Sequence, residues 1–208
     1  MKLLDKLKNR IKYDKKLVLF LIILGIIGIA AGSIFVTLLN SNDTKMITEY
    51  LNNFLTNIQN NEMNYLNVLK NNLITNIFYV ILIWLLGISI IGLPIILIIY
   101  FSKTFILGFS IGSIISVYKF KGILFAISYV FPGQILTLIS ISILTMYAIS
   151  FSLKLIYAIF KRKTIDFKMI MNKYLIVLGI VLLIVVLSNL YDTFVMPNII
   201  KTIMPFIK

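Results

Sequence analysis

Long apolar runs, separated by short polar or glycine-containing breaks, make up most of the chain after residue 16. A helix rises about 1.5 Å per residue, so about 20 apolar residues cross the roughly 30 Å of hydrocarbon in a bilayer. The pattern predicts an all-α polytopic integral membrane protein with about five transmembrane helices. The predicted spans are residues 17–39, 73–101, 104–118 (a short span), 122–160 (a broken span with a cytoplasmic extension) and 174–196.

Glycine and proline interrupt the central apolar stretch at several places. Lipid offers no hydrogen-bond partner to a freed backbone group, so such breaks need repair by neighbouring helices or polar side chains. Small residues also let two helix backbones approach closely. We therefore expect a packed core in which the following residues pack helices or break them: Gly87, Gly92, Pro94, Gly108, Gly112, Pro132, Gly133 and Gln134. A further small-residue stripe in the first predicted span consists of Gly25, Gly28 and Gly32.

Residues 40–72 form the one sizeable polar segment, and within it apolar residues recur at helical spacing. The stripe consists of Ile47, Leu51, Phe54 and Ile58, and we call it the apolar stripe. The opposite face is rich in Asn and Thr, whereas helices that dock on a bilayer usually carry Lys or Arg there. The sequence therefore predicts an outward amphipathic helical segment. Two destinations for its apolar stripe stay open, namely docking to a partner protein and packing against the chain's own spans.

The net charge of +13 comes largely from two clusters, with seven basic residues between Lys2 and Lys16 and six between Lys154 and Lys173. Such clusters next to spans indicate cytoplasmic topology signals and contacts with anionic lipid headgroups, so nucleic acid is not an expected partner. Both clusters lie on one side only if an even number of crossings separates them. Four crossings require residues 104–118 to cross the bilayer, with Lys103 anchored at the inner interface.

This count gives a basic amphipathic N-terminus (residues 1–16) and a basic loop (161–173) in the cytoplasm, with the tail (197–208) outside. A re-entrant hairpin at residues 104–131 would instead place the two basic clusters on opposite sides, against the positive-inside rule. The predicted protein is therefore multi-pass, with its N-terminus cytoplasmic and its C-terminus outside.

The chain has no cysteine and no histidine, which excludes disulfides, thiol nucleophiles and imidazole acid–base chemistry. A Ser–Lys pair or a pair of membrane carboxylates is not evident, since Asp166 is predicted to be cytoplasmic and Asp192 to lie near the outer end of the last span. We therefore expect no enzymatic activity, cofactor or metal. The polar groups expected within the membrane serve either as interhelical hydrogen bonds or as a transport site. They are Ser89, Ser110, Gln134, Ser140, Ser142, Asn189 and Asp192.

Four motifs occur in order between Ile83 and Ile156, and they read IWLLGISIIGLP, SKTFILGFSIGS, YVFPGQ and ISFSLKLI. With the basic N-terminus and the chain length, they make the sequence similar to the stage II sporulation protein M family. The wider family tends to show Pro-His-Gly with a downstream Glu, where this chain has Pro132-Gly133-Gln134. The resemblance implies a non-enzymatic membrane scaffold of the endospore engulfment machinery, located in the mother-cell membrane at the sporulation septum. Its implied partners are the septal peptidoglycan hydrolases named sporulation proteins D and P. A small membrane transporter or permease-like subunit is the alternative function.

Overall fold

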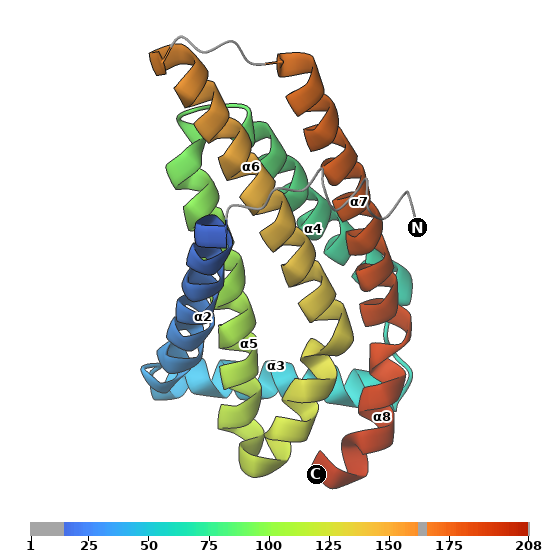
Figure 1. Ribbon diagram of the computed structural model, residues 1–208. Coiled ribbons are helices and arrows are strands. Elements are labelled where there is room, and N and C mark those ends of the chain that lie inside the picture. The colour runs from blue at the N-terminus through green and yellow to red at the C-terminus, as the bar shows by residue number, and fades with distance from the viewer. Residues whose placement is uncertain (1–14, 162–165, 208) are drawn as a thin grey trace.

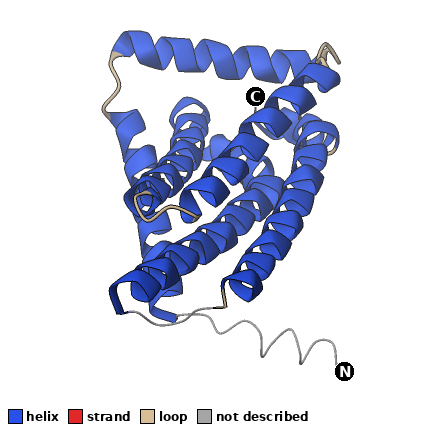
Figure 2. Ribbon diagram, turned by 90° about the horizontal axis from the view of Figure 1, so that it is seen from above, coloured by secondary structure: helices blue, strands red, loops and turns tan. Residues whose placement is uncertain are grey.

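The computed structural model describes residues 15–161 and 166–207, and these residues form helices and loops without any strand (Figure 2). The helices are α2 (Lys15–Thr37), α3 (Ser41–Gln59), α4 (Tyr65–Gly87), α5 (Gly92–Tyr129), α6 (Ile135–Lys161), α7 (Phe167–Phe194) and α8 (Met196–Ile207), and a π-helical turn, η1 (Val130–Gln134), joins α5 to α6. The predicted all-α membrane fold is confirmed. Most of the predicted basic N-terminus and residues 162–165 of the basic loop lie outside the described residues.

Within the described chain, four helical stretches are long and apolar enough to cross a membrane: Lys15–Thr37, Tyr65–Gly87, Gly92–Phe160 and Phe167–Phe194. The third stretch turns back on itself at Lys119, whose φ of 54° lies in the left-handed region and divides α5 into two arms (Figure 1). It therefore passes along the bundle twice, first as residues 92–118 and then as the second arm with η1 and α6. This agrees with the prediction of about five transmembrane helices.

The turn between the second and third passes lies at residues 88–91, and this corrects two predicted spans. The predicted second span runs through residue 101 and the predicted third begins at 104, because a lysine inside hydrocarbon is costly. In the structure α4 ends at Gly87, and Lys103 lies near the middle of the first arm of α5. The third pass is thus long enough to cross without the shortening that the sequence analysis expected.

Polar side chains from α6 and α7 repair the break at residues 88–91. The Ser152 hydroxyl donates to the carbonyl oxygens of Gly87 at 2.6 Å and Ser89 at 3.2 Å. The Tyr174 hydroxyl donates to the Trp84 carbonyl at 3.0 Å. The carbonyls at the end of α4, which have no partner within their own helix, are therefore satisfied by side chains of neighbouring helices.

Helices α2 and α5 pack with their backbones in close contact, and glycines on both helices make this approach feasible. An added Cβ at Gly32 would meet the Phe105 carbonyl oxygen, and one at Gly108 would meet the Ile29 carbonyl oxygen. The Ser33 hydroxyl donates across the same interface to the Gly108 carbonyl at 2.9 Å. The small-residue stripe of the first predicted span thus packs against the first arm of α5, in the same interface where Gly108 meets Ile29 and Gly112 meets Ser33.

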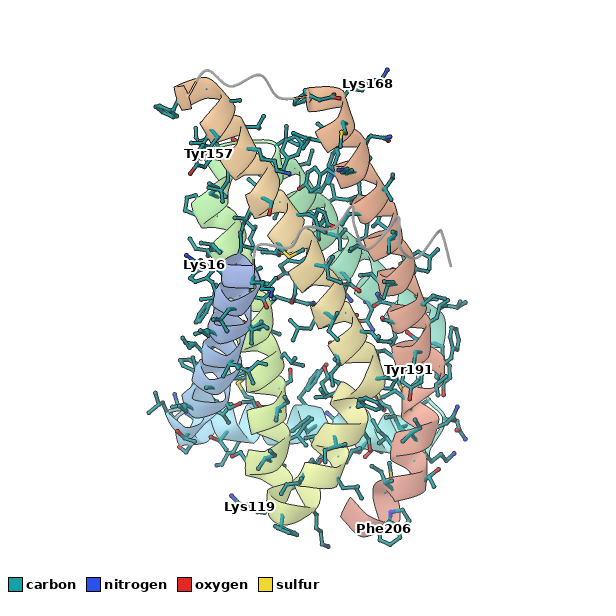
Figure 3. The ribbon with its side chains drawn as sticks, viewed as in Figure 1. Lys16, Lys119, Tyr157, Lys168, Tyr191 and Phe206 are labelled. Carbon is teal, nitrogen blue, oxygen red and sulfur yellow. The ribbon has the colours of Figure 1, made fainter. Side chains whose placement is uncertain are left out.

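Helix α3 lies across one end of the bundle, which we call the α3 end (Figure 1). Its N-terminus is capped by Asn40, whose side-chain oxygen accepts from the Asp43 amide at 2.8 Å. Phe206 of α8 and the turn at Lys119 lie at the same end, whereas Tyr157 of α6 and Lys168 of α7 lie at the opposite end (Figure 3). Buried residues of α3, α5 and α8 form an apolar cluster there that includes Leu55, Ile114 and Ile200.

Candidate functional site

A chain of polar side chains joins α5, α4 and α7 inside the bundle. The Lys103 ammonium donates to Asn76 Oδ1 at 2.7 Å, and Asn76 Nδ2 donates to Asn189 Oδ1 at 2.8 Å. The Asn189 amide in turn donates to the Val185 carbonyl at 2.7 Å. Asn76 is the central residue of α4, and Asn189 lies toward the C-terminal end of α7, so this chain lies inside the bundle at the level of the middle of α4. Each asparagine both donates and accepts, which satisfies groups that lipid would leave unpaired.

A second polar pair lies one helical turn further along α7. Gln134 Nε2 donates to Asp192 Oδ2 at 2.9 Å. Only 5% of Asp192 is exposed, and its other oxygen, Oδ1, is buried without a hydrogen-bond partner among the described residues. Lys103 attracts this carboxylate electrostatically, but its ammonium is hydrogen-bonded to Asn76 and lies 5.0 Å from the centre of the Tyr79 ring. Two opposite charges therefore share the interior of the bundle.

The Pro132-Gly133-Gln134 sequence brings Gln134 to Asp192. The chain departs from helical geometry at Phe131, and the Phe131–Pro132 peptide bond is cis. Gly133 packs directly on the Asp192 carboxylate, where an added Cβ would meet Oδ1. Glycine at this position thus makes room for the carboxylate, and the next residue supplies its hydrogen-bond donor. The predicted helix break therefore has a specific polar partner on α7.

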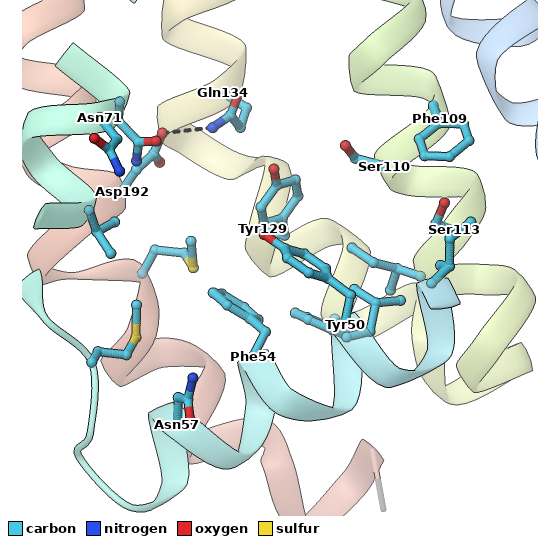
Figure 4. Close-up of a pocket in the computed structure, with 18 of the residues that line it drawn as sticks. Tyr50, Phe54, Asn57, Asn71, Phe109, Ser110, Ser113, Tyr129, Gln134 and Asp192 are labelled. Atoms are coloured by element: carbon cyan, nitrogen blue, oxygen red, sulfur yellow. Dashed lines mark hydrogen bonds between the residues drawn. The ribbon is translucent and has the colours of Figure 1, made fainter. Parts of the chain in front are cut away.

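A cavity of about 870 Å³ lies between this polar pair and α3 (Figure 4). Helices α3, α4, α5 and α7, Gln134 of η1 and Met196 of α8 contribute to its wall. Its polar groups include Asp192, Gln134, Ser110 and Tyr129, and its apolar lining includes Phe54. Helix α3 therefore covers a hollow that reaches from one end of the bundle to the buried carboxylate.

The apolar stripe of α3 packs inward, and this decides between the two destinations that the sequence left open. Leu51 is 8% exposed and Ile58 is 3% exposed, while Ile47 and Phe54 are half-buried against the same apolar cluster. The stripe is therefore covered by the chain's own helices, and the expectation that it forms a partner docking surface is corrected. The physical reason is that α5 and α8 form an apolar surface at the α3 end of the bundle. The sequence pattern did not predict that these two helices would lie there.

The other expected packing residues lie at helix contacts or helix starts. Gly87 packs on Ala148 and Tyr174, and Gly92 follows the turn with its amide donating to the Ser89 carbonyl at 3.2 Å. Pro94 is the third residue of α5, in the first turn, where its missing N–H has no intrahelical role.

Sequence reasoning missed the roles of Asn76 and Lys103. It placed Lys103 at an interface and did not single out Asn76. The Gly92-Leu93-Pro94 sequence could have placed the turn between the second and third passes there instead of at Lys103. Asn76 and Lys103 would then each have been recognised as a polar residue near the middle of an apolar helix. Asn189 and Asp192 were identified as polar groups within the membrane, but their partners were not.

The described residues contain no group of three or more His, Cys, Asp or Glu side chains that could hold a metal ion. What the arrangement offers chemically is a buried carboxylate oxygen without a hydrogen-bond donor among the described residues, and a lysine held by the hydrogen-bonded chain of Asn76 and Asn189. Intramembrane ionisable residues of this kind mark functional positions in membrane proteins.

No curated protein and no solved structure matches the chain. The family model for stage II sporulation protein M matches residues 18–197, which include all of the membrane passes except the first residues of α2, and also α3 and the residues of both polar groups. The chain therefore belongs to the stage II sporulation protein M family, and it is a multi-pass membrane protein of sporulation.

Proposed function

We propose that this protein is a non-enzymatic membrane platform of the endospore engulfment machinery, which holds septal peptidoglycan hydrolases in the mother-cell membrane. Family membership over residues 18–197 is the observation that carries the proposal. In this proposal the partners are sporulation proteins D and P, and the chemistry of wall degradation belongs to them. The bundle supplies a rigid surface on which they assemble.

The α3 end faces the wall-containing space in this proposal. Lys168 lies at the opposite end of the bundle (Figure 3), and Lys154 and Lys173 belong to the last turns of α6 and the first turns of α7, toward that same end. Positive residues gather on the cytoplasmic side of membrane proteins, which supports this orientation. With the apolar stripe buried, the surface left for a partner is the outer face of α3, where Asn53 and Thr56 are exposed.

Affinity capture from sporulating cells tests the platform. A tagged chain is expected to recover sporulation proteins D and P, identified by mass spectrometry. Asn53→Glu is expected to reduce this recovery at unchanged protein level, because it places a charge on the outer face of α3. Asn172→Glu is the matched control, since Asn172 is exposed near the opposite end on α7. Failure of the unmodified chain to recover either hydrolase would refute the platform.

Transport is the second candidate function, and the Lys103–Asn76–Asn189 chain beside a cavity favours it. Transporters place polar and ionisable groups near the middle of their spans. Purified protein in vesicles that contain a pH-sensitive dye tests this candidate under an imposed membrane potential. A flux above that of empty vesicles that disappears in Lys103→Met would support transport. Equal flux in vesicles with the unmodified protein and in empty vesicles would leave the platform as the function.

A further inference from the structure

The cavity beneath α3 has the size and composition of a small-molecule site. Its volume of about 870 Å³ lies within the roughly 300–1,000 Å³ of ligand pockets, which combine apolar walls with a few polar groups. Phe54, Phe109 and Phe125 form much of the apolar wall, and Tyr50 and Tyr129 also line it. Figure 4 shows the rings of Tyr129 and Phe54 directed into the same space as Ser110. Aromatic faces of this kind attract cations.

The charge of the lining is negative. Its ionised side chains are the carboxylates of Asp192 and Glu62, and no lysine or arginine occurs among the described residues that form the wall. Glu62 is exposed, so Asp192 is the deep charge. Lys103 is the cation that acts on Asp192 from within the bundle, but its ammonium is bound to Asn76 and lies outside the wall. The hollow therefore offers acidic and aromatic groups to its contents, without a basic side chain of its own.

Asp192 lines the cavity, and one of its carboxylate oxygens has no hydrogen-bond donor within the described chain. Oδ2 accepts from Gln134, whereas Oδ1 is buried and has no hydrogen-bond partner among the described residues. A buried acceptor without a donor is costly, and the cost is greater for a charged group than for a neutral one. A donor that carries positive charge would satisfy both the hydrogen bond and the charge.

We propose that this cavity binds a ligand that carries a protonated amine. The ammonium group donates to the Asp192 carboxylate where that side chain lines the cavity and lies near the Tyr129 ring, and the apolar part of the ligand packs against Phe54 and Phe109. The site is independent of the proposed platform function, because it requires no partner protein. Two sources share the chemistry, namely a small organic amine and the headgroup of an aminolipid.

A matched pair of probes tests the charge requirement. The purified full chain in phosphatidylcholine nanodiscs is titrated calorimetrically with 2-phenylethylamine and with 2-phenylethanol, which has similar size but no charge. The amine is expected to bind at least about tenfold more tightly, which corresponds to about 1.4 kcal/mol, because hydrogen bonds between charged groups are stronger than those between neutral groups. Equal affinities for the two probes, or no binding of the amine, would overturn the proposal.

Two variants locate the site. Asp192→Asn is expected to remove the preference for the amine, whereas Asp166→Asn is expected to keep it, because Asp166 is exposed at the start of α7. Ser110→Phe fills the hollow without altering the carboxylate and is expected to abolish amine binding even if Asp192→Asn fails to fold. Retention of tight amine binding in Ser110→Phe would contradict the proposal.

The source of the amine is distinguished by lipid composition. Replacing part of the phosphatidylcholine with phosphatidylethanolamine is expected to weaken 2-phenylethylamine binding if an aminolipid headgroup occupies the cavity. Unchanged binding in the mixed nanodiscs supports a small organic amine. Either result identifies the source of the amine once 2-phenylethylamine has been shown to bind more tightly than 2-phenylethanol.

Discussion

Replacing Gly108 with alanine is expected to separate α2 from α5. The added Cβ would meet the carbonyl oxygen of Ile29, and it would lie 2.7 Å from both the carbonyl carbon and the Cα of that residue. All three contacts are with backbone atoms of α2, so no side-chain rotation relieves them. The interhelical hydrogen bond from Ser33 to the Gly108 carbonyl would lengthen as the helices move apart.

The magnitude follows from the kind of contact. Overpacking a close interface costs about 1–3 kcal/mol, and loss of one hydrogen bond adds about 1 kcal/mol. Alanine favours the helix over glycine by about 1 kcal/mol, which opposes part of this cost. We therefore expect the Gly108→Ala change to lower the free energy of unfolding by about 1–3 kcal/mol.

Unfolding in mixed micelles, followed by circular dichroism as the fraction of denaturing detergent rises, measures this loss. Gly179→Ala is the control, because its Cβ would have no heavy atom of another described element within 4 Å. This variant is expected to match the unmodified protein or to exceed its stability slightly. Equal stability of the Gly108→Ala and Gly179→Ala variants would show that the α2–α5 contact is not as close as described.

Three further outcomes are expected. Asn76→Leu leaves the Lys103 ammonium without its acceptor and should lower the free energy of unfolding by about 3 kcal/mol in the same assay, whereas adding Lys103→Met should recover most of the loss. Ser152→Ala unpairs a carbonyl at the end of α4 and should lower it by about 1–3 kcal/mol, with an unchanged value arguing against that repair. A reporter enzyme that is active only outside the cytoplasm should be active when fused after Asn60 and silent after Lys161, and the reverse pattern would invert the orientation.

The apolar runs were enough to predict the fold class and the broken fourth pass, because hydrophobic length and proline position act locally. The bounds of the second and third passes were wrong for a physical reason. Sequence reasoning assigned the turn to Lys103, since an isolated lysine in hydrocarbon is costly. The partner that reduces this cost is Asn76, 27 residues earlier and on another helix. A local pattern contains no information about such a pairing.

The candidate site was predicted less completely than the fold. The break at Pro132-Gly133-Gln134 was identified, but its contact with Asp192 depends on how α7 packs against η1. The apolar stripe of α3 was identified from its periodicity, whereas the surface that covers it is assembled from α5 and α8. Periodicity thus located the interacting faces, and only the three-dimensional arrangement supplied their partners.

The hydrogen-bonded chain from Lys103 through Asn76 to Asn189 also bears on how the protein is inserted into the bilayer. A lysine at the centre of a helix opposes insertion by about 2.5–3.5 kcal/mol on scales measured with the cellular insertion machinery. Asn76 precedes Lys103 in the chain, so α4 is synthesised first and is available as a companion when the helix carrying the lysine emerges. We therefore expect insertion of the third pass to depend on the second, and Asn189 of α7 to complete the hydrogen-bonded chain once α7 has been inserted.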